Sequence, residues 1–316
     1  MLGRGVATRL EEAPRRPLIS AALREVISEA DLFILNLECC ISARGSPWPD
    51  PAKMFFFRAP PVAARALRDM GVSCVTLANN HALDFGQDAL VDTVRYLDEM
   101  GIRHIGAGWN VDEARAPAIL EKQGMRLAVF GVTDHPASFS AEKDRPGVAF
   151  ADLRREVPEW LVDALGTIDA DATLVTPHWG PNMTSEPLPF VRAAARALVD
   201  AGATLIAGHS AHVFHGVDGN ALFDLGDFVD DYAVDPVLRN DLGLLFLVTL
   251  GRFGIRRIEA VPLKLTFCFT GLAGEEDAAA IGRRFRAACS AFGTEVREER
   301  GRLLIDFERD DLAQSL

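Results

Sequence analysis

The chain has 316 residues, of which 49% are hydrophobic and 25% charged, a composition typical of a globular protein with one large or two modest domains. Its formal net charge of −12 disfavours binding to nucleic acid or to an anionic membrane, because phosphate groups would repel it outside local basic patches. The five cysteines form no C-x-x-C pair, and their odd number argues against a complete disulfide framework.

Helices and strands alternate along the first two thirds of the chain. Residues 18–30 have the apolar spacing of a helix and lead into a strand at 31–35. A helix that begins at Pro61 ends at Gly71, and a strand at 72–78 follows. The same order continues with helices at 89–100, 153–165 and 188–200 and strands at 102–105, 125–132, 171–177 and 203–208. This alternation predicts an α/β fold with a parallel, helix-covered sheet.

The pattern changes after residue 211. Strands follow one another across short turns, and we expect them to be antiparallel; they are predicted at 213–217, 221–224, 242–250 and 255–265. A helix at 276–292 and a strand at 302–307 close the chain. We therefore predict a single domain over 1–316, with mostly parallel βα units in 1–211 and a mostly antiparallel second sheet with a closing helix in 212–316.

Four of the predicted strands run at their carboxyl ends into residues that can bind a metal ion. These residues are Asn36 and Glu38, then Asn79, Asn80 and His81, then His178, and finally His209 and His212. In an open α/β sheet the ligand crevice lies outside the carboxyl ends of the strands, so such side chains converge there. Imidazoles with an Asn oxygen and a carboxylate favour Mn, Fe or Zn.

The strongest single motif runs from Asn79 through Asn80 and His81 to Asp84. The Asn80 oxygen can bind a metal while His81 donates a proton to a leaving oxygen, provided that Asp84 orients the imidazole ring. Taken alone, the motif is equally consistent with a polar helix cap that carries a surface histidine. We assign His81 and Asp84 as the catalytic pair.

Gly208 lets the chain turn sharply off its strand, so that His209 and His212 can face one point. His178 adds a third imidazole, and Glu38 supplies the negative charge that balances an ion. Asn36 can orient Glu38 or a substrate. Three other histidines have no comparable setting and are interpreted as ordinary polar residues: His104, His135 and His215.

An acidic segment carries Asp227, Asp230, Asp231 and Asp235. We interpret it first as a solvated loop or a set of helix caps, and second as a lining of the metal site. Other chemistries lack their motifs, since there is no Walker-type Lys loop, and a nucleophile elbow would need Gly where His212 stands.

Taken in order, these motifs resemble the CapA-type capsule-synthesis family, named for poly-γ-glutamate assembly, whose fold is similar to the calcineurin-like metallophosphoesterases. The resemblance rests on residues 1–6, Asn36-Leu37-Glu38, residues 78–86, His178-Trp179-Gly180, residues 208–213 and Leu225-Gly226-Asp227-Phe228. It implies a four-layer α-β-β-α sandwich with one or two divalent ions (Mn, Fe or Zn) at the strand ends.

By this analogy one ion would be bound by Asn80, His178 and His209 and a second by His212, with Glu38 between them. The remaining motif residues are assigned to substrate binding: Arg4, Asn36, Asn79 and Asp227. Many family members carry Asn at the position of Asp227. Members also begin with an apolar strand that ends in Gly-Asp before the segment equivalent to Met1, so we expect that strand and its metal ligand to be lacking here, or encoded upstream.

The leading functional hypothesis is a metal-dependent hydrolase of phosphate esters or a related bond, acting on a small-molecule or polymeric anionic substrate. The alternative, from the family name, is a non-catalytic component of capsule polymer assembly that binds an anionic polymer. No apolar run is as long as a membrane span, and residues 1–16 lack a signal-peptide core. As written, we expect a cytoplasmic protein without a nucleic-acid partner, although an upstream N-terminus could change its location.

Overall fold

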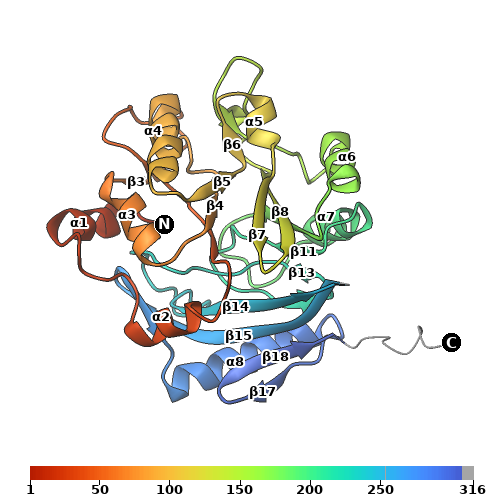
Figure 1. Ribbon diagram of the computed structural model, residues 1–316. Helices are drawn as coiled ribbons and strands as arrows, with labels where there is room; N and C mark the ends of the chain where they lie inside the picture. The colour runs from red at the N-terminus through yellow and green to blue at the C-terminus, as the bar shows by residue number, and fades with distance from the viewer. Residues whose placement is uncertain (253, 308–316) are drawn as a thin grey trace.

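The computed structural model describes residues 1–252 and 254–307. Its helices are α1 (Arg4–Glu12), α2 (Ala21–Ile27), α3 (Val62–Asp69), α4 (Gly86–Glu99), α5 (Val111–Arg115), α6 (Glu159–Thr167), α7 (Pro189–Asp200), α8 (Glu275–Ser290) and the 3-10 helix η1 (Ala137–Phe139). No helix in these described ranges is both long enough and apolar enough to cross a bilayer. Helices and strands together make a mixed α/β fold (Figure 1).

The strands form three larger sheets. A parallel sheet has the order β1 (Ile34–Asn36), β4 (Cys74–Thr76), β5 (Arg103–Ile105). A six-stranded sheet has the order β12 (Val217–Asp218), β13 (Ala221–Leu222), β11 (Leu205–Ala207), β10 (Ala172–His178), β8 (Met125–Thr133), β7 (Ala118–Lys122). An antiparallel sheet has the order β14 (Leu242–Gly251), β15 (Gly254–Thr266), β18 (Arg302–Asp306), β17 (Arg297–Glu299), and β16 (Phe269–Leu272) also pairs with β15. Two short pairs are β2 (Cys40–Ile41) with β3 (Arg58–Ala59) and β6 (Ala107–Gly108) with β9 (Gly147–Val148).

The six-stranded sheet is buried on both faces. Along β8, Phe130 and Val132 pack into a hydrophobic cluster with residues of α6 and α7, while Val129 between them packs into a second cluster with Leu244 of β14 and Phe285 of α8. Successive strand side chains point to opposite faces, which is why a continuous apolar run is needed here. In Figure 1, β14 and β15 accordingly run between this sheet and α8.

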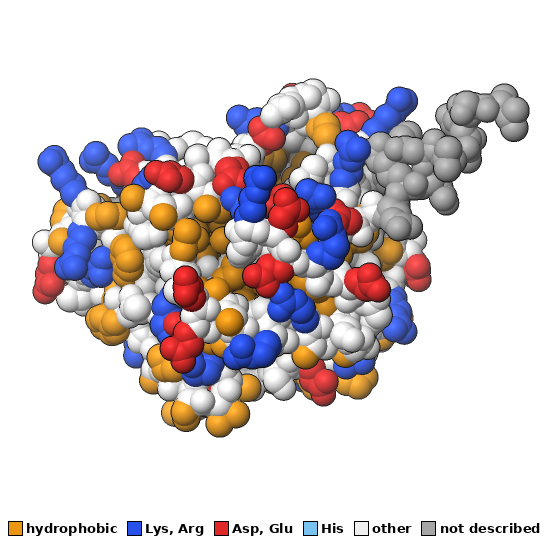
Figure 2. All heavy atoms as spheres, turned by 90° about the horizontal axis from the view of Figure 1, so that it is seen from below, with side chains coloured by type: hydrophobic (Ala, Val, Ile, Leu, Met, Phe, Trp, Pro, Cys, Tyr) orange, Lys and Arg blue, Asp and Glu red, His pale blue; other side chains and the backbone are white. Residues whose placement is uncertain are grey.

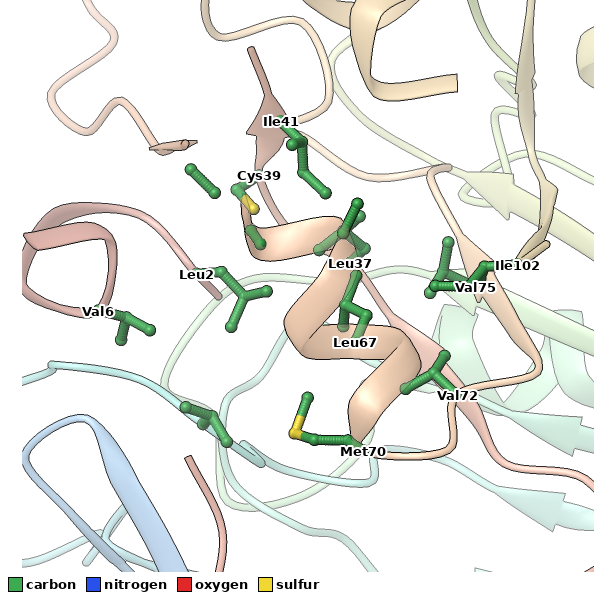
Figure 3. Packing of buried hydrophobic residues seen from close by; sticks show 14 of the residues in the cluster. Leu2, Val6, Leu37, Cys39, Ile41, Leu67, Met70, Val72, Val75 and Ile102 are labelled. Carbon is green, nitrogen blue, oxygen red and sulfur yellow. The ribbon is translucent and has the colours of Figure 1, made fainter. Parts of the chain in front are cut away.

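A further core lies around α3, next to the parallel three-stranded sheet. Leu67 and Met70 belong to one buried hydrophobic cluster with Val75 of β4 and with Leu2 and Val6 at the start of the chain (Figure 3). Truncating a fully buried leucine such as Leu67 to alanine costs about 2–5 kcal/mol in general. This core holds the strand ends of β1 and β4 in place, and the polar residues of the site follow directly after them.

The strands β8, β10 and β11 end at one edge of their sheet. Thr133 pairs with His178 in the parallel register of β8 and β10, and a parallel bridge joins His178 to His209 beyond the end of β11. Because parallel strands in this register end side by side, the residues that follow them lie together.

Two predictions from the sequence are wrong after residue 211. The expected strand at 213–217 is reduced to β12, which begins at Val217, and β13 pairs parallel with β11 instead of lying only in an antiparallel sheet. A tight turn at Gly219, with a φ of +54°, joins β12 and β13 into a short hairpin. That hairpin extends the parallel sheet at its edge, through the register Ile206 with Ala221.

A cavity of about 630 Å³ lies between the sheets, and both β1 and β14, the end strands of their sheets, contribute to its lining. Its apolar wall includes Leu174, Leu205 and Leu244, and its polar end includes Glu38 and His209. On the face shown in Figure 2, acidic and basic side chains are intermixed around apolar ones. The cavity therefore connects a largely apolar interior with the polar strand ends.

Candidate metal centre

His178 and His209 lie at the ends of neighbouring strands and touch each other directly. Their Nδ1 atoms are 2.8 Å apart, so one ring donates a hydrogen bond to the other. The backbone holds them in this position, because the His209 amide donates to the Pro177 carbonyl at 3.0 Å. Burial, followed by the neighbouring imidazole charges, lowers the pKa of His178 well below its ordinary value and that of His209 to about 3. Both rings are therefore neutral at pH 7, as metal-ligating histidines must be.

Glu38 is held by a chain of amide side chains from the other parallel sheet. Asn36 donates from Nδ2 to Glu38 Oε2 at 3.0 Å, and Asn79 donates to Asn36 Oδ1 at 2.9 Å. Asn79 also donates to the Leu37 carbonyl. The Asn36 amide thus orients the Glu38 carboxylate, one of the two roles that the sequence left open for it.

His81 and Asp84 form the pair that the motif predicted. The His81 Nδ1 atom lies 2.7 Å from Asp84 Oδ2, and its Nε2 lies 4.0 Å from Glu38 Oε1. Asp84 also accepts from the Phe57 amide and pairs with Lys53 at 2.8 Å. Sequence reasoning missed Lys53, because nothing local marks a lysine 31 residues upstream as a partner of this carboxylate.

His212 is bonded to a carboxylate instead of another imidazole. Its Nδ1 lies 2.9 Å from Asp227 Oδ1. Burial opposes a charge on this ring, but the negative charges of Asp227 and Glu38 outweigh it and raise the His212 pKa to about 10. The backbone here is constrained, with a φ of +61° at His212 and +132° at Ser210, conformations that non-glycine residues rarely adopt.

The acidic segment is only in part the solvated loop or set of caps preferred from sequence. Asp235 accepts from the Val237 and Leu238 amides, as a cap does. Asp230 and Asp231 are buried, and burial together with the charge of Asp227 raises the pKa of Asp230 to about 7. Asp231 accepts from the Gly5 amide and pairs with Arg4 at 3.4 Å. The segment packs inward because the chain start covers it, which no local pattern shows. The substrate-binding role of Arg4 stays a prediction, since its recorded partner among the described residues is Asp231.

Among the residues predicted to bind metal or substrate, five buried polar atoms have no hydrogen-bond partner, and nearby Asp84 Oδ1, Asp230 Oδ2 and Asp231 Oδ1 also lack one. The five are Glu38 Oε1, Asn80 Oδ1, His178 Nε2, His209 Nε2 and Asp227 Oδ2. Each unpartnered buried polar group costs about 1–3 kcal/mol in general, so five together indicate a missing partner. All five belong to groups of the kinds that a divalent ion takes. The imidazole whose Nδ1 accepts in the contact between His178 and His209 carries its proton on Nε2, so that proton would have to move to Nδ1, with loss of the contact, when an ion binds. The donor set therefore fits a metal ion.

The side chains, as they stand, are not gathered around a single ion. Among the described residues, no group of three or more His, Cys, Asp and Glu side chains is arranged to hold one. Asn80 is not one of these four residue types. The direct contact between His178 and His209 also occupies one nitrogen of each ring. The unpartnered atoms still fit a metal ion, because a small rotation of either imidazole ring leaves the chemical types of the donors unchanged.

The three remaining histidines differ in their surroundings. His104 pairs with Asp98 at 3.2 Å near the surface, and the ring of His215 lies 2.9 Å from the Thr184 carbonyl. His135 instead lies against the site, with its ring centroid 5.2 Å from that of His178. The signal that could have found it is the one used for the other ligands, namely its place just after strand β8.

The fold and site define an α/β protein with polar donor atoms at the ends of parallel strands. The chain belongs to the family described as bacterial capsule synthesis protein PGA_cap, which matches residues 1–232. It is 31% identical over 211 residues to the PGA biosynthesis protein CapA of Bacillus subtilis, covering 64% of this chain and 53% of that protein. It is also 31% identical over 289 residues to a probable polyglutamine synthesis accessory protein of Mycobacterium tuberculosis, covering 84% and 74%.

The chain spans about half the length of the two Bacillus CapA proteins that it matches, 53% and 42%. Among solved structures, a putative 5'-nucleotidase of Staphylococcus aureus is similar with a TM-score of 0.42 and 12% identity, covering 83% of this chain and 51% of that one. The NAD nucleotidase of Haemophilus influenzae is similar with a TM-score of 0.39 and 14% identity, covering 69% and 46%. Similarities at this level carry no argument about function.

Proposed function

We propose that this protein is a metal-dependent hydrolase of phosphate esters or of a related bond. The observation that carries the proposal is the group of unpartnered, buried donor atoms at the strand ends. A divalent ion (Mn, Fe or Zn) would be held by Glu38, Asn80, His178 and His209, and His212 would serve a second ion. Bound there, the ion would supply Lewis-acid polarisation and activation of water.

His81 is the proposed proton donor to the leaving oxygen. Asp84 fixes its Nδ1 atom, and the ion pair with Lys53 in turn fixes Asp84, so the ring cannot turn freely. Its Nε2 atom lies on the side of Glu38, where the reacting oxygen would be. General acid catalysis of this kind contributes about 10²- to 10⁴-fold in rate.

The fold proposed for this function is a four-layer α-β-β-α sandwich of the metallophosphoesterase type. It is supported by helices α6 and α7 on one face of the six-stranded sheet and by β14 and α8 on the other. The three-stranded and five-stranded sheets would together form the second β layer. The cavity lined by β1 and β14 lies where that layer is interrupted.

The test uses purified protein supplied with Mn²⁺, assayed for bound metal and for hydrolysis of generic phosphomonoesters and phosphodiesters. We expect His81→Ala to keep its metal and to lose at least about 100-fold in turnover. We expect His178→Ala to lose both metal and activity, because it removes a ligand. His104→Ala, a histidine outside the site, serves as the matched control and should behave as the wild type. Unchanged turnover in both site variants would rule the mechanism out.

A second candidate function is favoured by family membership and by the names of the relatives. In this alternative the protein is a non-catalytic component of polymer assembly, and the same crevice holds an anionic polymer such as a polyglutamate. The two candidates differ in one measurement. Metal-dependent retention of polyglutamate, without hydrolysis of any ester, would favour the assembly role, as would adjacent genes for amide ligation and export.

A further inference from the structure

The strand β8 brings a fifth histidine to the crevice. Thr133 at its end pairs with His178, and the Asp134 amide donates to the His178 carbonyl at 3.0 Å. His135 follows directly, and its ring centroid is 5.2 Å from that of His178. Three neighbouring parallel strands, β8, β10 and β11, thus each run at the same edge into a histidine, and the outermost of these histidines has no role so far.

The imidazole of His135 is oriented by a buried carboxylate. Its Nδ1 atom is hydrogen-bonded to Asp134 Oδ1, and the Asp134 side chain is fully buried. Asp134 Oδ2 accepts from the Gly180 amide at 3.1 Å and lies 3.9 Å from Arg154, so the carboxylate is held from both sides. With the proton placed on Nδ1 by this contact, the lone pair is on Nε2. A carboxylate that fixes one ring nitrogen while the other binds an ion is the usual setting of a metal-ligating histidine.

We propose that His135 is a further metal ligand of this centre, beside His178, and that Asp134 is its positioning residue. The proposal rests on the metal centre of the proposed function but does not require that the centre hydrolyse anything. The ring remains accessible, with 27% of the side chain exposed, whereas His178 is fully enclosed. His135 would therefore be the ligand on the solvent side of the centre.

His104 provides a matched comparison within the same chain. It also pairs with a carboxylate, Asp98, and lies in a parallel strand, β5. However, Asp98 is 64% exposed, and no second imidazole is recorded against His104 among the described residues. If removing any carboxylate-paired histidine weakened metal binding, His104→Ala would weaken it as well. If His135 is a ligand, only His135→Ala should weaken it.

The experiment titrates the full chain with Co²⁺ in a chelator-buffered solution and measures metal bound per chain, affinity and the visible spectrum of the bound ion. We expect His135→Ala to weaken Co²⁺ binding or to lower its stoichiometry, by more than the about 10- to 100-fold in affinity that removing an outer-shell partner costs, and to change the spectrum. Asp134→Asn should give a smaller loss in the same direction. His104→Ala should match the wild type.

The outcomes separate this proposal from the proposed function. If His135→Ala melts as the wild type does and binds Co²⁺ with wild-type affinity and spectrum, His135 is not a ligand, even if ester hydrolysis is observed. If binding depends on His135 while no phosphate ester is hydrolysed, the ligand assignment stands and the hydrolase does not. A wild-type chain that binds no Co²⁺ would overturn both. If His135→Ala is unfolded by circular dichroism, the Asp134→Asn titration decides, and wild-type binding there overturns the proposal.

Discussion

Two regions of the crevice hold buried imidazoles in opposite charge states. At the ends of β10 and β11, His178 and His209 contact each other, and burial keeps both neutral. In the loop that follows, His212 is almost as buried but contacts Asp227, and it carries a proton up to a pKa of about 10. Burial by itself favours the neutral form in both regions, so the partner decides the charge. One region is therefore ready to bind a cation without losing a proton, and the other is not.

The largest expected effect comes from removing the carboxylate in the second region. In metal-free protein at pH 7, Asp227→Asn should lower the free energy of unfolding by about 3 kcal/mol, because it leaves the buried His212 without its counter-charge. The NMR-measured pKa of His212 should fall below 7 at the same time. Urea unfolding in the presence of a chelator gives the free energy. A variant as stable as the wild type, with His212 still protonated, would show that Asp227 does not set this charge.

A smaller effect is expected from pH in the first region. His209 has a folded pKa of about 3 against about 6.5 when unfolded, so below pH 6.5 the unfolded chain takes up a proton that the folded chain refuses. This histidine therefore lowers the stability of the metal-free wild type by about 2 kcal/mol between pH 6.5 and pH 5, at about 1.4 kcal/mol per pH unit. The measurement is the difference in unfolding free energy between the wild type and His209→Gln, followed over that range.

The wild type should lose about 2 kcal/mol relative to His209→Gln as the pH falls. Asp224 acts in the opposite sense, because burial raises its pKa to about 7 and the folded chain binds its proton first. Asp224 is present in both proteins, so its contribution cancels in the difference. A stability difference that does not change with pH would mean that His209 is protonated in the folded state.

The smallest effect is expected where a histidine and a carboxylate meet at the surface. His104 and Asp98 are 3.2 Å apart, close to the distance in the His212 and Asp227 pair, but Asp98 is largely exposed. Asp98→Asn should change the free energy of unfolding by about 0.5 kcal/mol or less, since water screens an exposed pair. A loss as large as that of Asp227→Asn would show that burial is not what separates the two pairs.

Several parts of the site follow from local pattern. The motif from Asn79 to Asp84 predicted the contact between His81 and Asp84, which spans a few residues of one turn. The strand-end positions of His178 and His209 predicted that these side chains converge, because parallel strands end at a common edge. Asn36 and Glu38 are also close in space because they are only two residues apart in the sequence. In each case the two residues are either close in sequence or follow the ends of neighbouring parallel strands.

Other parts could not be predicted in this way. The ion pair between Lys53 and Asp84 joins a Pro- and Phe-rich loop to the segment that follows a strand. No local pattern in either segment indicates this contact. The burial of Asp230 and Asp231 depends on the start of the chain lying over them, more than 220 residues away, as the contact of the Gly5 amide with Asp231 shows. The position of His135 beside His178 could not be predicted either, because the sequence does not show that the strand at 125–132 lies next to the strand that ends at His178.

Which residues end strands can be predicted from local sequence, because apolar periodicity and the glycines that stop helices act over a few residues. The sequence also determined the chemical types of donor at those ends, from Glu38 to His212. Which strand ends are neighbours depends on long-range packing, since the order of β8, β10 and β11 is set by contacts across both faces of the sheet. The tertiary structure also decided the charge of each imidazole, because the dielectric surroundings and the partner of a buried ring come from distant segments.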